Sequence, residues 1–113
     1  MTGKAGLGEL ERLVLLAVLR LGEGAYGVSI RDEIFGRTGR SVGPGTIYPT
    51  LDRLEAKGLV RSKLGEPTPE RGGRGKRHFR LTAQGMAEAS RAWRELSRLA
   101  EGLEGLLDPG REP

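Results

Sequence analysis

The sequence predicts a mainly α-helical protein with one small β-hairpin. In four separate stretches, apolar residues recur at spacings of three and four, which is the period of an amphipathic helix. Two shorter stretches, 59–64 and 76–81, have the composition of strands and flank a loop rich in glycine and proline. A chain of 113 residues with this pattern is expected to form one domain around one core.

The first predicted helix, from Glu9 to Leu21, is apolar nearly all round. One set of apolar residues shares a face, and a second set points elsewhere. Because a helix of this kind is usually buried on two sides, we expect the second set to meet another subunit in so small a chain. The first set is Leu10, Leu13, Val14, Ala17 and Leu21, and the second is Leu15, Leu16 and Leu19.

The second predicted helix runs from Tyr26 to about Thr38. It follows a break at residues 22–24, where two glycines disfavour helix. Its Tyr26, Ile30 and Ile34 are spaced by four, so they are expected to stack on one face.

The third predicted helix runs from Pro44 to Lys57. Proline suits the first helical position, where a missing N–H costs nothing, and Gly58 follows as a C-terminal cap. Pro49 must lie in the first turn or kink the helix. The expected core stripe consists of Ile47, Leu51 and Leu54.

The hairpin that follows holds most of the positive charge. The whole chain has a net charge of +4, and residues 61–80 carry seven basic side chains against two acidic ones, whereas residues 81–113 carry four against six. In the second strand, Phe79 and Leu81 alternate with polar residues, which places His78 on the exposed face. A local basic segment of this kind is a candidate contact for phosphate groups.

The last predicted helix runs from Ala83 to about Leu107, with Thr82 as its N-cap. Its apolar residues follow a heptad pattern, and a helix about 37 Å long would present more apolar length than the rest of the chain can cover. We therefore expect dimerisation through this seam, weakened at its distal end by Gly102 and Gly105. The seam consists of Met86, Ala89, Trp93, Leu96, Ala100, Leu103 and Leu107.

Three helices followed by a two-stranded wing form a winged helix-turn-helix, here joined to a long C-terminal dimerisation helix. The expected organisation is a flexible N-terminus, a winged-helix domain that binds DNA, the dimerisation helix and a disordered tail. These parts cover residues 1–8, 9–82, 83–107 and 108–113.

Several classes of protein are excluded by what the sequence lacks. It has no cysteine for disulfides or thiolate sites, and its one histidine cannot build a multi-histidine zinc site. No apolar run approaches the roughly 20 residues of a membrane span, and no signal peptide is recognisable, so we expect a cytoplasmic protein. Without a carboxylate pair, metal cluster or phosphate loop at a recognisable spacing, an enzyme and a cofactor are not expected.

Three stretches together resemble the PadR family of bacterial transcriptional regulators. The resemblance covers about residues 9–105 and is most specific in the middle stretch. It implies a homodimer in which the last helix pairs with its mate and with the first helix. It also implies a repressor that binds inverted repeats in double-stranded DNA, released in some members by small aromatic compounds. The stretches are Leu15–Leu19 with Gly24–Gly27, Val42–Leu51 with Arg53–Glu55 and Gly58–Val60, and Arg77–Thr82 with Gly85.

Two groups of residues are therefore candidates for DNA contact. The third helix fits the major groove, and the basic hairpin can lie along the backbone or in the minor groove. The alternative is a winged-helix module that binds proteins and has lost DNA binding. The candidates are Thr46, Tyr48, Pro49, Thr50 and Arg53 on the helix, and Arg71, Arg74, Lys76, Arg77 and His78 on the hairpin.

Trp93 allows two interpretations. A lone tryptophan among methionine, alanine and leucine is what a dimer core needs, and this is the simpler one. In multidrug-sensing relatives, aromatic side chains of this helix hold planar compounds at the dimer centre, and Trp93 with its symmetry mate is placed to do the same.

Overall fold

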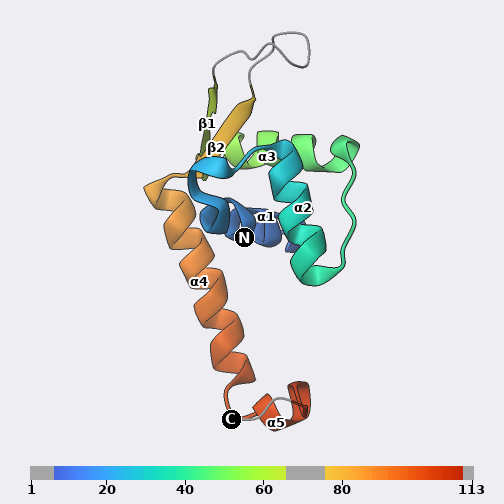
Figure 1. Ribbon diagram of the computed structural model, residues 1–113. Helices are drawn as coiled ribbons and strands as arrows, with labels where there is room; N and C mark the ends of the chain where they lie inside the picture. The colour runs from blue at the N-terminus through green and yellow to red at the C-terminus, as the bar shows by residue number, and fades with distance from the viewer. Residues whose placement is uncertain (1–6, 66–75, 111–113) are drawn as a thin grey trace.

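The winged helix-turn-helix predicted from the sequence is the fold of the protein. The computed structural model describes residues 7–65 and 76–110. Figure 1 shows a body of three helices, with the hairpin projecting from one side and the last long helix extending from the other. The elements are α1 (Glu9–Leu21), the short 3₁₀ turn η1 (Gly22–Gly24), α2 (Gly27–Thr38), α3 (Pro44–Ala56), β1 (Val60–Leu64), β2 (Arg77–Leu81), α4 (Ala83–Ala100) and α5 (Glu104–Leu107).

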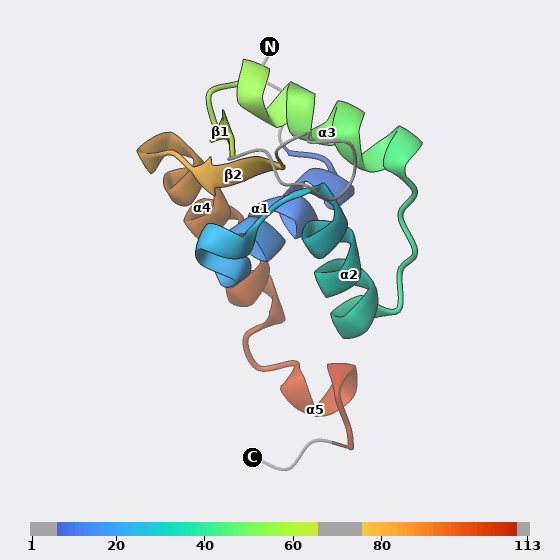
Figure 2. The same ribbon diagram turned by 45° about the horizontal axis from the view of Figure 1, so that its top comes forward.

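Helix α1 lies at the centre of the core. It contacts α2, α3, α4 and β2, and Figure 2 shows it below α3 with the other elements arranged around it. Val14, Leu15 and Val18 are almost completely buried. They pack with residues from every other main element, namely Ile30, Ile34, Ile47, Leu51, Leu54, Leu59, Val60, Phe79 and Ala89.

The wing is an antiparallel pair of strands in a single register. Val60 lies opposite Leu81, and Leu64 lies opposite Arg77. The segment after η1 extends this small sheet, because the Phe79 N–H donates to the Ala25 carbonyl at 2.8 Å. The wing is thereby joined at one edge to the turn between α1 and α2.

Two close contacts join α3, the wing and α4. Gly58, which follows the C-cap residue Lys57 of α3, has a φ of +79°, so the left-handed cap predicted there is present. The Thr82 hydroxyl caps α4 by accepting from the Gly85 N–H at 2.9 Å, and it donates to the Gly58 carbonyl at 2.6 Å. A Cβ at Gly85 would overlap the Leu59 carbonyl, so only glycine allows α4 to begin this close to β1.

The last helix is shorter than the sequence predicts. Helix α4 ends at Ala100, and the chain turns at Gly102, whose φ is +87°, before the single turn α5 begins. A continuous helix to Leu107 was expected, but glycine has low helix propensity and readily adopts positive φ. Leu103 consequently lies in the connecting turn and Leu107 lies in α5, so neither continues the seam of α4.

The structure corrects two residues of the expected dimer surface. Leu15 is fully buried in the core of its own chain, and Ala89 packs against the same core. Leu16 and Leu19, one turn apart on α1, are exposed instead. The reason is that α1 is surrounded on more than one face by its own chain, which helical periodicity alone does not reveal.

The ends of the chain differ in part from the expectation of loose segments. Residues 1–6 and 111–113 lie outside the described residues. Leu7 packs against the core, and the Gly8 N–H donates to the Glu11 carboxylate at 2.9 Å, so residues 7–8 are held in place. At the other end, the Asp108 N–H closes α5 by donating to the Glu104 carbonyl.

Candidate nucleic-acid interface

Helix α3 presents a polar face to the outside and an apolar face to the core. Ile47, Leu51 and Leu54 are fully buried, as their spacing predicts. The outward face is exposed along the length of the helix, and Figure 2 shows that no other helix lies across it. Its exposed candidate residues are Thr46, Tyr48, Pro49 and Arg53.

Pro49 lies inside α3, in its second turn, and the helix continues through it. Because proline has no N–H, the carbonyl of the residue four positions earlier, Gly45, receives no helical hydrogen bond from it. Gly45 is exposed, so water can satisfy that carbonyl.

Thr50 was expected among the DNA contacts, but it is fully buried. Its hydroxyl donates to the Thr46 carbonyl at 2.7 Å and accepts from Arg53 Nη2 at 3.1 Å. Thr50 therefore orients Arg53 instead of reaching outward. The sequence pattern placed Thr50 on the flank of the helix, and the packing of α3 onto the body covers that flank.

Tyr48 packs against the beginning of α2. A Cβ at Gly27 would overlap the hydroxyl and ring of Tyr48, so this contact requires a glycine as the first residue of α2. The side chain remains partly exposed. Tyr48 thus lies where the surfaces of α2 and α3 meet. Its side chain occupies the space that a Cβ at position 27 would need, which explains why Gly27 follows Tyr26.

A buried carboxylate ties the C-terminal half of α3 to α1. Lys57 Nζ lies 3.0 and 3.1 Å from the two carboxylate oxygens of Glu11, and Arg53 Nε lies 3.6 Å from one of them. Burial opposes ionisation of Glu11, but hydrogen bonds from the Gly8 N–H and from Lys57, with the nearby positive charges, lower its pKa overall. Glu11 was not among the residues predicted from the sequence, although it stands three positions after Gly8, which is the spacing of a helix capping box.

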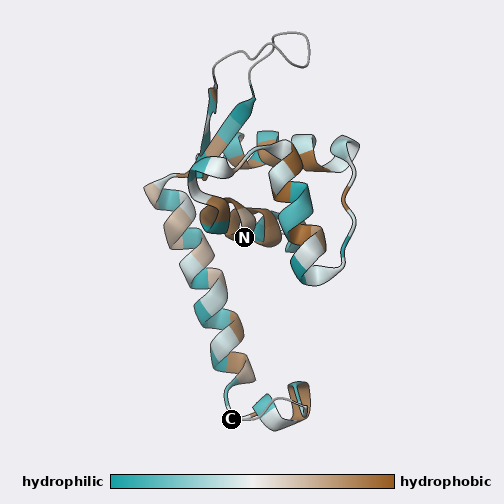
Figure 3. Cartoon of the chain, in the orientation of Figure 1, coloured by the Kyte–Doolittle hydropathy of each residue, from teal (hydrophilic) through white to brown (hydrophobic). Residues whose placement is uncertain are grey.

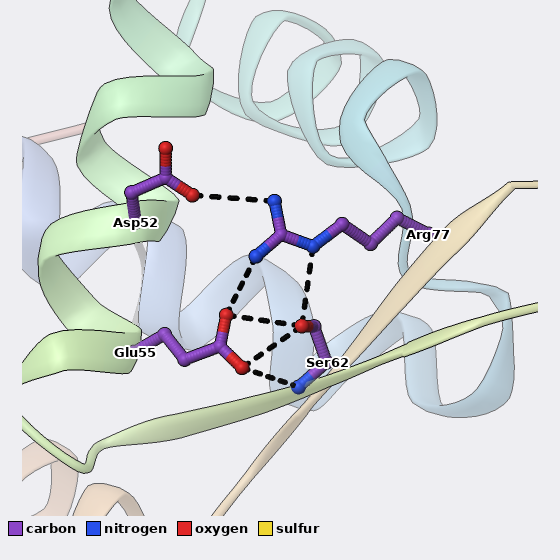
Figure 4. Close-up of polar contacts among 4 residues, drawn as sticks. All are labelled: Asp52, Glu55, Ser62 and Arg77. Atoms are coloured by element: carbon purple, nitrogen blue, oxygen red, sulfur yellow. Dashed lines mark hydrogen bonds and ion pairs between the residues drawn. The ribbon is translucent and has the colours of Figure 1, made fainter.

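Arg77 was expected to contact phosphate, but its guanidinium binds residues of its own chain. Nη2 lies 2.6 Å from Glu55 Oε1, Nη1 lies 3.2 Å from Asp52 Oδ1, and Nε donates to Ser62 Oγ at 3.1 Å (Figure 4). Its strand position faces α3, and the nearest carboxylates on that helix complete the pairing. The hydrogen bond from Ser62, with smaller contributions from Arg77, holds the pKa of Glu55 below its ordinary value despite partial burial.

His78 is also less available than the alternation of the strand indicates. It is half-buried, and Tyr26 packs edge-on against it with ring centroids 5.5 Å apart. Lys76 is exposed, with its ammonium 4.2 Å from the centre of the Tyr26 ring. The segment of Tyr26 that joins the sheet covers His78, and a strand pattern cannot predict this additional neighbour. Arg71 and Arg74 lie outside the described residues.

The face of the wing turned away from Arg77, which also carries His78, has three cations that were not among the predicted DNA contacts. Arg61 and Arg80 lie directly opposite each other in the register, and Lys63 follows on the same face of β1. Among the described residues, none of the three forms an ion pair. Their alternation along β1 and β2 was readable from the sequence.

Comparison with known proteins assigns the family. Residues 15–91 match the PadR-like family of transcriptional regulators, and this range includes α2, α3, the wing and the first half of α4. The chain belongs to the PadR-like family. It is 39% identical over 80 residues to the transcriptional regulator Rv3488 of Mycobacterium tuberculosis, a match that covers 71% of this chain and 70% of that protein.

Solved structures agree with this assignment. A PadR-like transcription factor from Bacteroides fragilis superimposes with a TM-score of 0.68 at 25% identity, covering 86% of this chain and 88% of its own. F93, a winged-helix DNA-binding protein from STIV, shares the fold, with a TM-score of 0.67 at 20% identity over 87% of this chain and 98% of its own. The PadR-like chain is thus a transcriptional regulator and not an enzyme.

Two further observations concern the described part of this PadR-like chain. Within residues 7–65 and 76–110, no helix is long and apolar enough to cross a membrane. No cluster of three or more histidine or acidic side chains suited to a metal ion occurs in those same ranges.

The link between Glu11 and Lys57 predicts a pH-dependent contribution to stability. A carboxyl group whose pKa is lowered on folding stabilises the protein above its ordinary pKa, and this contribution is lost as the pH falls through the lowered value. Glu11→Gln should reduce the free energy of unfolding by roughly 1–3 kcal/mol at pH 7, because it removes charged hydrogen bonds from a buried site. Urea unfolding measured between pH 7 and pH 3 should show this difference shrinking toward acid pH.

Glu9→Gln is the matched control, since Glu9 is exposed on the same helix and its ion pair with Arg40 lies at the surface, where such pairs contribute little. It should change the unfolding free energy little at any pH. A difference between wild type and Glu11→Gln that stays constant down to pH 3 would mean that the Glu11 charge does not stabilise the fold.

Proposed function

We propose that the protein is a homodimeric repressor that binds an inverted repeat in double-stranded DNA, with α3 in the major groove and the wing along the backbone. One observation carries this proposal: the outward face of α3 is polar, and both of its carboxylates, Asp52 and Glu55, are paired with Arg77. Thr46, Tyr48, Pro49 and Arg53 are left facing outward at this surface. The hydroxyl groups of Thr46 and Tyr48 in the first turns, and the guanidinium of Arg53 further along the helix, suit base edges and phosphates.

The remaining cations of the wing support a backbone contact. Lys76 is exposed directly before β2, and Arg71 and Arg74 precede it in the sequence, outside the described residues. We propose that these three residues bind phosphate or the minor groove. The alternative is a winged-helix module that binds proteins. Such a module would not need a basic wing, and it would not need both carboxylates of α3 to be paired.

Dimerisation is proposed through α4. Its first turns contact α1 and β2, whereas the distal part stands away from the body, with hydrophobic residues along it that no other described element covers (Figure 3). Trp93 and Leu96 are 65% and 64% exposed. Leu16 and Leu19 on α1 and Met86 on α4 are also exposed. A second copy that pairs its α4 with α4 and α1 would bury these residues together.

An effector site at the dimer centre is proposed on Trp93. Its indole is exposed on the face of α4 that the dimer would use, so two indoles related by symmetry would lie close to the two-fold axis. Planar aromatic compounds stack well on such a pair.

The role of α3 predicts the behaviour of Thr46→Ala. A half-site of the operator should lie about one helical turn, roughly 34 Å, from its mate. If Thr46 reads a base, its loss should cost roughly 1–3 kcal/mol at that position and relax the sequence preference there. Selection of bound duplexes from a random pool, followed by fluorescence anisotropy, measures both effects.

Thr38→Ala is the control, because Thr38 ends α2 and bonds to its own helix. It should select the same sequences as wild type. If wild-type protein retains no duplex from the pool, it does not bind DNA specifically and the protein-binding alternative is favoured. If Thr46→Ala and Arg53→Ala both weaken binding with unchanged selected sequences, α3 is not the element that reads the bases.

The dimer predicts that Leu96→Asp separates the subunits. A carboxylate at an exposed apolar position would be buried without a partner in the interface, so the variant should be monomeric at micromolar concentration in sedimentation experiments. Arg98→Asp introduces the same residue on the other side of α4 and should remain dimeric. A wild-type protein that sediments as a monomer under these conditions contradicts the proposed dimer.

The effector site predicts coupled changes in fluorescence and DNA binding. Trp93 is the single tryptophan of the chain, so its emission reports on this site alone. Planar aromatic compounds should quench it and weaken DNA binding over the same concentration range, since the two sites are thermodynamically linked. Quenching without any change in DNA affinity would contradict an effector role, and a screen without quenching would leave Trp93 as an interface residue.

A further inference from the structure

Arg77 forms the centre of a polar cluster at the root of the wing. All three of its guanidinium nitrogens have partners, and its carbon Cζ lies 5.0 Å from the ring centre of the buried Phe79. The Glu55 carboxylate also accepts from the backbone N–H and the hydroxyl of Ser62, at 2.9 to 3.2 Å (Figure 4). One cluster therefore joins both strands of the wing to α3.

The cluster is placed where it can fix the orientation of the rest of the wing. Arg77 lies opposite Leu64 near the outer end of the described hairpin, and beyond this pair the Gly65 N–H donates to the Lys76 carbonyl at 2.6 Å. Nearer the body, the wing is held by buried Val60 and Phe79, but Leu64 is exposed and makes no comparable apolar anchor. Beyond the core, Tyr26 holds the wing to the α1–α2 turn through His78 and Lys76. The described contacts that fix the direction of the wing relative to α3 are those of the Arg77 cluster, in which Arg77 and Ser62 bind the carboxylates of that helix.

The charges of the cluster have a second consequence. Asp52 and Glu55 are the only acidic residues of α3, and they lie one turn apart toward its C-terminal end. On a helix that approaches a polyanion, two free carboxylates repel phosphate, and this repulsion acts over about 10 Å at 0.1 M salt. Arg77 contacts both of them at once, so it neutralises part of this charge and holds it away from the outward face.

We propose that Arg77 is a positioning residue that sets the angle between wing and α3 and shields DNA from Asp52 and Glu55, and that it is not a phosphate ligand. The proposal rests on the proposed DNA binding. It differs from the role expected for Lys76, whose ammonium has no carboxylate partner among the described residues.

A double-mutant cycle distinguishes shielding from direct contact. Arg77→Met keeps the aliphatic stem and removes the charge, and Asp52→Asn with Glu55→Gln removes the carboxylates. In the proposed role, Arg77→Met weakens binding to a random-sequence duplex about tenfold, equivalent to about 1.4 kcal/mol. Neutralising the carboxylates should then restore affinity more strongly in the Arg77→Met protein than in the protein that retains Arg77.

If Arg77 is instead a phosphate ligand, the double-mutant cycle does not show a larger gain in affinity in the Arg77→Met protein. Removing Asp52 and Glu55 would release Arg77 toward DNA, so the gain in affinity would be equal or larger when Arg77 is present. In the protein that keeps both carboxylates, a phosphate ligand also predicts that Arg77→Met reduces the salt dependence by about 0.9 per lost phosphate contact. Either result overturns the proposal.

The angle of the wing can be measured without DNA. Because the chain has no cysteine, spin labels can be attached to cysteines introduced at Gly45 in α3 and Lys63 in β1, in dimers with one labelled subunit. An added Cβ at Gly45 has no neighbour within 4 Å, and Lys63 is exposed. Arg77→Met should broaden the distance distribution, whereas Arg80→Met, which removes the same charge from the other wing face, should leave it unchanged.

An unchanged distribution in Arg77→Met would overturn the positioning role. This measurement also separates the present proposal from the proposed function. Wild-type protein that fails to bind any duplex refutes DNA binding, while a wing that loosens only in Arg77→Met still supports the cluster as its positioning device.

Discussion

The burial of α1 on several faces is the constraint on which the rest of the structure depends. Val14, Leu15 and Val18 are almost inaccessible to solvent, and the elements that cover them come from every other part of the fold. Burial of apolar side chains is the main favourable term in folding, and α1 supplies its centre. The orientation of α3, and with it the surface proposed to contact DNA, follows from how Ile47, Leu51 and Leu54 pack in the core around this helix.

Polar contacts then hold α3 and the wing in positions that apolar packing alone does not determine. Glu11 on α1 draws Lys57 and Arg53 to one side of α3, and Glu55 with Asp52 draws Arg77 and the wing to the other. Each acidic group on α3, and Glu11 against it, is thereby paired within its own chain, while Lys63 and Arg80 have no carboxylate partner among the described residues. The net charge of the chain is small, but its distribution leaves positive charge free at the wing.

The single chain leaves apolar surface that its own fold does not cover. The core closes around α1 with only the first turns of α4, because the short body offers nothing for the distal turns to pack against. Gly102 ends α4 soon afterwards, so the apolar residues of α5 do not extend the stripe that contains Trp93 and Leu96. A regulator with this shape is suited to complete its packing with a second copy.

The sequence by itself determined the order of the elements, most of their bounds and the family. Periodicity and capping residues act over a few neighbouring positions, so Thr82, Gly58 and the stripe of Ile47, Leu51 and Leu54 were all predictable. Tertiary structure decided which polar side chains remain available. Thr50, Arg77 and His78 matched the pattern of an exposed surface, yet Thr50 is covered where α3 packs onto the body, and Arg77 and His78 contact residues of other segments. The break at Gly102 is an intermediate case. Glycine at this position indicated a weak helix, but the heptad pattern led us to expect a continuous helix. Availability depends on contacts between residues far apart in the chain, and a local pattern carries no information about those contacts.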